Sequence, residues 1–443
     1  MVASKIIASK KKLLQAAERK VFRGFEVPED LAPLTDIDPN ESKASAKSGV
    51  APEAAADIWS AIEGFYRRGA HPFVSVCIRR HGEMILNRSL GYVKGAMGEC
   101  EPVIGSLDTP ICLFSSSKAV SAMLVHKLAE EGHIDLLTPV SYYIPEFAAG
   151  GKANITVHDL LSHRAGVPGI APDVPRDVLY DPEEALRHIC AMETLHSDGR
   201  VSAYHAITGG FVMAKLVEVT TGMSIQQYPD AVFRQPLGMK YFTYGIDKAL
   251  QPSVAHHYET GLKNPKLIEN VLTNVLGATV AEAIEISNTP EFMSSVIPSG
   301  NIYSTAEEAC RFFQMMLQRG EWQGQRVLDP VTVLRGTREV GGARLDKSLM
   351  LPMRYSAGMM LGGKPAGLYG VDTHHAFGHL GFSNILCWAD PQRDLAVSIV
   401  SSGKPVISTH IVPLLFSVLN RINKACEPCV DGLYELPQYR PAG

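Results

Sequence analysis

The stretch that decides the fold of this 443-residue chain is residues 113–132, with the sequence LFSSSKAVSAMLVHKLAEEG. From Ser115 onward, apolar and small residues recur at helical spacing, and Gly132 stands where a left-handed C-terminal cap is expected. The pattern predicts one buried helix over residues 115–131. Its first turn carries Ser115 and Lys118, which are three residues apart and therefore share one face of the helix.

This pair of residue types can support nucleophilic catalysis. A serine hydroxyl is a poor nucleophile at neutral pH unless a base lies within hydrogen-bond reach. If Lys118 is buried among apolar neighbours, desolvation lowers the pKa of its amine, which can then accept the proton of Ser115. The spacing also occurs by chance, as two solvated residues on a helix surface. Ser116 and Ser117 are competing nucleophiles, but neither has a lysine three residues later.

Two further segments carry groups that such a pair would need. Tyr204-His205-Ala206 precedes a run with helical spacing that closes at Gly222, and a tyrosine there can act as a general base and acid. The segment GHLGF at 378–382 leads directly into a predicted strand, and the backbone N–H of Phe382 is a candidate oxyanion donor. Each segment also has a purely structural interpretation, as a core tyrosine and as a tight turn.

The hydrophobic pattern along the chain predicts an α+β fold, an antiparallel sheet flanked by helices with a mainly helical inserted domain. Alternating residues predict a hairpin over 73–93 and strands over 382–388 and 395–400, so the two ends of the chain would build one sheet. Helices are expected at 52–67, 305–319 and 407–422. The expected division is an N-terminal helix and arm over 1–52, a sheet domain over 53–132 and 291–425, a helical domain over 133–290 and a tail over 426–443.

Composition narrows the class of protein. Apolar residues make up 46% of the chain and the net charge is −4, which gives no reason to expect a nucleic-acid partner. The eight cysteines are scattered, as in a reduced compartment, and indicate a cytoplasmic location. Cys426-Glu-Pro-Cys429 has redox spacing but no strand–helix context, so chance spacing is favoured.

The N-terminal segment is basic, with five Lys, two Arg and one Glu within residues 1–24. It is interpreted as a packing or lid helix in preference to a helix on a membrane surface. No apolar run of about 18 residues occurs, so no transmembrane helix is expected.

Ser115-Ser-Ser-Lys118, Tyr204-His-Ala206 and His379-Leu-Gly381 occur in an order that resembles the penicillin-recognising serine hydrolases. The similarity covers about residues 55–422 and is strongest to class C β-lactamase-like esterases, the family VIII carboxylesterases. It implies a β-lactamase/penicillin-binding-protein-like fold, no cofactor and no metal. It further implies that Ser115 is acylated, that Lys118 and Tyr204 share proton transfer, and that His379, Gly381 and Phe382 line the substrate site. The N–H groups of Ser115 and Phe382 would form the oxyanion hole.

Two departures from the β-lactamase pattern predict the substrate. Ala206 stands where those enzymes carry an Asn that binds a substrate amide, and His379 replaces a Lys that helps to hold a carboxylate. Both changes favour neutral esters, and together with the resemblance they imply short acyl chains, so a small ester is the expected partner. An acyltransferase, a β-lactamase or D-Ala peptidase, and a non-catalytic binding protein remain alternatives. We find no Gly-x-Ser-x-Gly pentapeptide, and the His256-His257 and His374-His375 pairs are better explained as loop residues than as zinc ligands.

Overall fold

The computed structural model describes residues 22–41, 45–170, 174–196, 199–406 and 410–429. Within these ranges, every ladder of the main sheet is antiparallel, and the strand order is β14-β17-β18-β19-β3-β4-β2, with β5 also paired to β4. The central β3–β19 pair joins the two ends of the chain, as the sequence predicts. The strands are β2 Thr35–Ile37, β3 Phe73–Arg80, β4 Glu83–Lys94, β5 Val103–Ile104, β14 Met360–Leu361, β17 Phe377–Leu380, β18 Leu386–Asp390 and β19 Leu395–Ser401.

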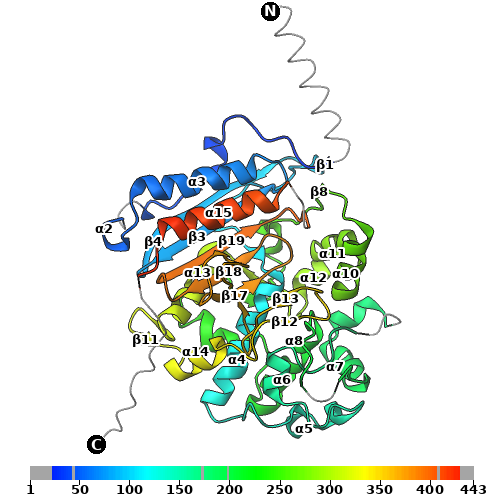
Figure 1. Cartoon of the computed structure of the whole chain (residues 1–443). Helices are drawn as coiled ribbons and strands as arrows, with labels where there is room; N and C mark the ends of the chain where they lie inside the picture. Colours follow the sequence, from blue (N-terminus) through cyan, green and yellow to red (C-terminus); the bar gives the residue numbers. More distant parts are fainter. Residues whose placement is uncertain (1–21, 42–44, 171–173, 197–198, 407–409, 430–443) are drawn as a thin grey trace, which may run out of the picture.

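Helices cover both faces of this sheet, which explains why its central strands are apolar on both sides. On β3, Val76 and Ile78 point to one cluster and Cys77 between them points to another, as the period of two requires. The first face packs against α3 (Pro52–Tyr66) and α15 (Val412–Ala425), which lie side by side in Figure 1. The second face packs against α13 (Ala306–Leu317).

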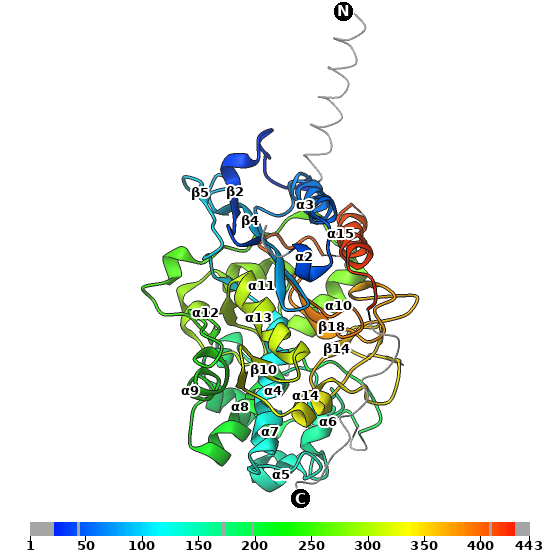
Figure 2. The ribbon, with the colours of Figure 1, turned by 90° about the vertical axis from the view of Figure 1, so that its left-hand side faces the viewer.

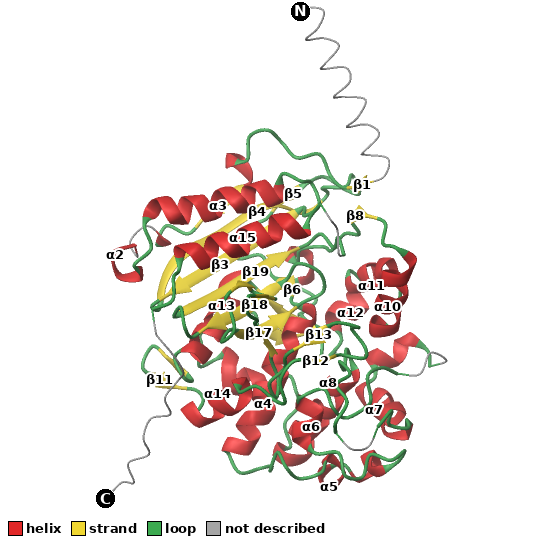
Figure 3. Cartoon of the chain, viewed as in Figure 1, coloured by secondary structure: helices red, strands yellow, loops and turns green. Residues whose placement is uncertain are grey.

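Residues 133–290 are mainly helical where they are described, with only two short strands. The helices between residues 140 and 221 lie below the main sheet in Figures 1 and 2, whereas the helices between residues 266 and 287 lie beside it in Figure 1. Figure 3 shows these helices in red next to the yellow strands of the sheet. The helices are α5 Val140–Tyr143, α6 Val157–Leu161, α7 Pro182–Ala191, α8 Thr208–Thr221, α9 Gln227–Pro229, α10 Lys266–Leu276 and α11 Val280–Ser287, with 3-10 turns Pro145–Ala148, Arg176–Tyr180 and Gln251–Ser253 and a π turn Asp230–Arg234.

Short elements complete the chain. They are β1 Phe22–Arg23, β6 Ile111–Cys112, β7 Thr243–Tyr244, β8 Gly261–Leu262, β9 Ile302–Ser304, the hairpins β10 Glu321–Trp322 with β11 Gln325–Arg326, β12 Arg344–Leu345 with β13 Pro352–Met353 and β15 Ala366–Gly367 with β16 Gly370–Val371, and the helices α2 Ser45–Ser48, α12 Pro290–Ser294 and α14 Pro330–Thr337, besides a 3-10 turn Ala32–Leu34. In the described ranges no single helix can cross a membrane; α10 and α11 meet the length and hydropathy requirement only as a pair bent by 44°.

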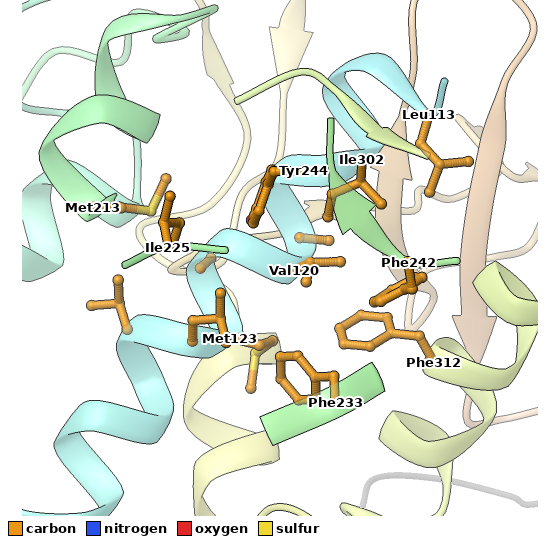
Figure 4. Packing of buried hydrophobic residues seen from close by; sticks show 14 of the residues in the cluster. Leu113, Val120, Met123, Met213, Ile225, Phe233, Phe242, Tyr244, Ile302 and Phe312 are labelled. Atoms are coloured by element: carbon orange, nitrogen blue, oxygen red, sulfur yellow. The ribbon is translucent and has the colours of Figure 1, made fainter. Parts of the chain in front are cut away.

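The helix α4 (Ser117–Glu130) occupies the centre of the molecule, between the sheet and the helical region. Figure 4 shows Val120 and Met123 of α4 among aromatic and aliphatic side chains from several elements, including Phe233 and Tyr244. Gly132 follows the C-cap of α4 with φ +78°, the left-handed conformation that glycine adopts at no steric cost. A helix buried on nearly all sides fixes the position of its first turn rigidly.

Two predicted boundaries are wrong. The strand expected over 382–388 begins only at Leu386, and GHLGF is no turn at its start, because Phe377–Leu380 is itself the strand β17. Gly378 serves close strand packing, since a Cβ there would lie 2.5 Å from the Cα of Trp388.

The N-terminal arm also differs from expectation. Residues 1–21 of the predicted basic helix lie outside the described residues, and Phe22–Arg23 form a strand paired with β8. The arm over 26–52 buries Leu31 and Leu34 and supplies β2, the edge strand of the main sheet. A strand of three residues is too short to show a period in the sequence.

Candidate active site

Ser115 lies in a 3-10 turn, Phe114–Ser116, that joins β6 to α4. Phe114 has φ +46°, which is strained for a bulky residue, and its ring is held 4.6 Å from His257 and 5.5 Å from Phe382 between ring centroids. The turn leaves Ser115 partly exposed at the entrance of a buried helix.

The two neighbouring serines have structural partners instead. Ser116 is buried and donates from Oγ to the carbonyl of His379 at 3.0 Å. Ser117 is also buried, and its Oγ accepts from the N–H of Ile302 at 3.0 Å. Among the three candidates, only Ser115 combines access from solvent with a lysine partner.

Lys118 lies directly against Ser115. Its Nζ is 3.0 Å from Ser115 Oγ and 2.8 Å from the carbonyl oxygen of Ser299. The side chain is buried, and within the described ranges no carboxylate pairs with it. Burial therefore lowers the pKa of this amine well below its ordinary value, because desolvation disfavours the charged form. A neutral amine at this distance can accept the proton of the Ser115 hydroxyl.

Ser299 positions Lys118, and sequence reasoning missed it. Its carbonyl accepts from Lys118, its Oγ donates to the carbonyl of Ile207 at 2.7 Å, and its Oγ accepts from the N–H of Gly210 at 2.9 Å. The loop thus ties the first turn of α4 to the start of α8. Pro298-Ser299-Gly300 resembles any turn, so no pattern could have revealed this role.

Tyr204 lies in the loop before α8, buried, with its ring centroid 5.0 Å from Lys118 Nζ. Burial raises the pKa of its phenol; the Ser115 side chain opposes that effect and the charge of Asp346 adds to it. The hydroxyl forms no hydrogen bond of normal geometry within the described chain. The structure therefore brings Ser115, Lys118 and Tyr204 together, with the phenol protonated and available.

His379, Gly381 and Phe382 lie at the end of β17 and in the loop that follows. His379 is buried, with Nδ1 2.7 Å from the carbonyl of Leu380, and burial together with Lys118 lowers its pKa to about 3. Gly381 allows close approach, because a Cβ there would lie 2.5 Å from the carbonyl oxygen of Leu113, and its N–H donates to Ile385. Within the described ranges, no group accepts from the N–H of Phe382.

This arrangement contains a nucleophile, a buried amine whose pKa is lowered by desolvation, a protonated phenol and a free backbone donor. It fits acyl transfer, in which an oxygen nucleophile attacks a carbonyl and the charge that develops is held by N–H groups. No group of three or more His, Cys, Asp or Glu side chains able to hold a metal occurs in the part of the chain that the structure describes. Two cavities of the described chain, of about 520 and 550 Å³, lie elsewhere, beside Lys127 and beside Arg79.

Comparison with known proteins identifies the family of the chain and its fold. The family described as Beta-lactamase matches residues 58–412. The esterase/β-lactamase LipL of Mycobacterium tuberculosis is 28% identical over 330 residues, which are 69% of this chain and 72% of that protein. A penicillin-binding-protein homologue from Caulobacter crescentus superposes with a TM-score of 0.73 at 23% identity, over 85% of this chain and 98% of its own. A family VIII carboxylesterase superposes with a TM-score of 0.72 at 23% identity, over 83% of this chain and 97% of its own.

Proposed function

The chain belongs to the β-lactamase family and is a serine hydrolase, and from that premise we propose that it is a carboxylesterase for neutral esters with short acyl chains. One observation carries the proposal: Lys118 Nζ lies 3.0 Å from Ser115 Oγ, with the amine buried and its pKa well below the ordinary value. Acylation requires a base in contact with the hydroxyl, and the lowered pKa of the Lys118 amine favours the uncharged form that can accept a proton.

Acylation follows from this contact. As Ser115 Oγ attacks the ester carbonyl carbon, its proton passes to the amine of Lys118. The oxyanion that forms accepts hydrogen bonds from the N–H groups of Ser115 and Phe382. When the intermediate collapses, the bond to the alcohol oxygen breaks, and the alcohol leaves with a proton supplied by Lys118 through the phenol of Tyr204.

Deacylation repeats the same steps with water. Water replaces the alcohol near Tyr204 and gives its proton to the Tyr204–Lys118 pair as it attacks the acyl carbon. The bond to Ser115 Oγ then breaks, the acid leaves, and the serine oxygen regains its proton. One base can serve both half-reactions because the amine returns to its neutral state after each of them.

The residues around the pair favour an ester over a β-lactam or a D-Ala peptide. His379 is buried and its pKa is lowered to about 3, so it carries no charge at neutral pH to attract a substrate carboxylate. Ala206 packs in the same apolar cluster as Tyr204 and has no side-chain donor for an amide. LipL, the relative from Mycobacterium tuberculosis, is described as both esterase and β-lactamase, which supports weak β-lactam turnover as a side activity.

The test compares a p-nitrophenyl butyrate with a chromogenic cephalosporin on the wild-type protein, with intact-mass detection of the acyl adduct. We expect turnover of the butyrate to exceed that of the cephalosporin, and the adduct to map to the peptide that contains Ser115. Ser115→Ala should lose at least about a hundredfold in rate, since nucleophilic and general base catalysis are worth that much. Ser253→Ala, at an exposed serine, is the matched control and should leave the rate unchanged.

Other outcomes select the alternatives. Faster turnover of the cephalosporin would make β-lactam hydrolysis the main activity. An ester product formed with an added acceptor alcohol, in preference to free acid, would identify an acyltransferase. If Ser115→Ala keeps its adduct, the assigned nucleophile is wrong, and if no ester labels the wild-type protein, the proposal fails in favour of a binding protein.

A further inference from the structure

Asp346 is a fully buried acid in the loop between β12 and β13, far in sequence from the residues of the proposed site. Its oxygens accept five hydrogen bonds. Oδ1 accepts from the N–H of Tyr204 at 3.2 Å and from the N–H groups of Ser348 and Leu349, both at 2.9 Å. Oδ2 accepts from the hydroxyl of Tyr355 at 3.0 Å and from that of Ser202 at 3.3 Å.

A buried carboxylate is unfavourable unless its lone pairs are satisfied. Two of the five donors to Asp346 belong to the loop of Tyr204, namely the N–H of Tyr204 and the hydroxyl of Ser202, and the other three belong to the segment from Ser348 to Tyr355. Ser202 and Tyr204 belong to the loop before α8, whereas Tyr355 follows β13. The two segments have no sheet ladder in common. Asp346 therefore provides a polar link that holds the loop of Tyr204 against the β12–β13 hairpin.

The same contacts fix the ring of Tyr204. The imidazole of His163 lies between two phenols, with its centroid 4.7 Å from that of Tyr204 and 5.0 Å from that of Tyr355. Tyr204, Tyr355 and Met353 share one apolar cluster, and Leu349 packs against it. Because Asp346 accepts from the backbone N–H of Tyr204 and from the hydroxyl of Tyr355, it fixes the positions of the two phenol rings on either side of His163.

We propose that Asp346 is a positioning residue of the reaction, which holds the phenol of Tyr204 toward Ser115 and Lys118 through its hydrogen bonds to Tyr204, Ser202 and Tyr355. It touches no reacting atom. The inference rests on the proposed function, because it assumes that Tyr204 transfers protons during ester cleavage. Its negative charge also opposes formation of a phenolate at Tyr204, so the residue has an electrostatic effect in addition to the geometric one.

Two variants separate these effects. Asp346→Asn keeps Oδ1 for the three N–H donors, and the Tyr355 and Ser202 hydroxyls can turn to accept from the new amide, so only the charge is lost. Asp346→Ala removes all five bonds. Since misplacement of a catalytic group by about 1 Å is worth roughly a hundredfold in rate, we expect Asp346→Ala to lower kcat by at least about tenfold with KM changed less than threefold.

The pH profile distinguishes positioning from general stability. The titratable and charged groups that face Tyr204 are Lys118 of α4, His163 after α6, its neighbour His205, Asp346, Tyr355 and His379 of β17. Removal of the Asp346 charge favours the phenolate, so the alkaline limb of kcat should move to lower pH in Asp346→Asn. Tyr355→Phe, which removes one bond and no charge, should leave the limb in place.

The experiment uses p-nitrophenyl butyrate with the full chain, and Tyr204→Phe is measured alongside. If wild type is active and Tyr204→Phe is slow while both Asp346 variants keep the wild-type kcat and pH limb, this inference is overturned and the proposed function stands. If Tyr204→Phe is as fast as wild type, the proton-transfer role given to Tyr204 fails first. If Asp346→Ala does not fold, the test rests on Asp346→Asn alone: a shift of the alkaline limb of kcat to lower pH supports the inference, and an unchanged limb overturns it.

Discussion

Lys118 is a residue whose function opposes stability. Its amine is buried with no charged partner among the described residues, and its hydrogen bonds go to Ser115 and to the carbonyl of Ser299. A thioether of similar length would fill the same space without a polar group to desolvate. We expect Lys118→Met to lose at least about a hundredfold in kcat/KM and to unfold at a higher temperature than wild type, by calorimetry. Lys127→Met, on the same helix but paired with Glu130, should keep activity, and a Lys118→Met protein with wild-type kcat/KM would exclude Lys118 as the base.

Only part of the candidate site could be predicted at this scale. Ser115 and Lys118 share a helical turn, so spacing alone predicts their contact. Ser299 and Asp346 act through a backbone carbonyl and through hydrogen bonds to distant segments. Neither role depends on a pattern in the local sequence, because a carbonyl is present at every residue and one aspartate resembles another. Such residues are found only when the tertiary structure brings their partners to them.

Among the elements, α13 shows how a helix begins and what its cap supports. The hydroxyl of Thr305 accepts from the N–H of Glu308 at 3.1 Å, and the Glu308 carboxylate accepts from the N–H of Thr305, also at 3.1 Å, which completes a capping box. Glu308 also accepts from the N–H groups of Lys240 and Tyr241. We expect Thr305→Ala to lower the free energy of unfolding by about 1–2 kcal/mol in urea titration, while Thr305→Ser keeps the cap and stays within about 0.5 kcal/mol. Equal losses in both variants would show that the methyl group, and not the hydroxyl, matters.

Elements with a clear period were predictable, and those without one were not. The hairpin β3–β4 and the helices α4 and α13 follow from alternation and from helical spacing. The strand β17 was missed because Gly378 and Gly381 resemble a turn, although Gly378 is needed for close contact with Trp388 in the next strand. The edge strand β2 depends on pairing with β4, about fifty residues later in the chain. Its formation is a tertiary effect that a local propensity does not capture.

At the scale of the whole molecule, buried histidines make stability depend on pH. Burial lowers the pKa of His71, His205 and His379 to about 3 and that of His126 to about 4, from 6.5. Their pKa is lower in the folded state, so the unfolded chain binds more protons below pH 6.5. The contribution of these histidines to the free energy of unfolding is complete above pH 6.5, and it is lost as the pH falls toward their pKa in the folded state. Raised pKa values at Glu308 and Asp390 act in the opposite direction and offset part of the loss.

Between pH 7 and pH 5, each histidine with a pKa near 3 should lower the free energy of unfolding by about 2 kcal/mol. This is a large share of the roughly 5–15 kcal/mol typical of a domain, so urea midpoints should fall steeply over this range. His71 offers the sharpest control, because it stacks on Phe65 with ring centroids 4.2 Å apart, and phenylalanine keeps that stack without a titrating group. In His71→Phe the slope of unfolding free energy against pH near pH 5 should decrease by about 1.4 kcal/mol per pH unit, the value for one proton. An unchanged slope would mean that His71 binds its proton in the folded state, and that the acid sensitivity arises from other groups.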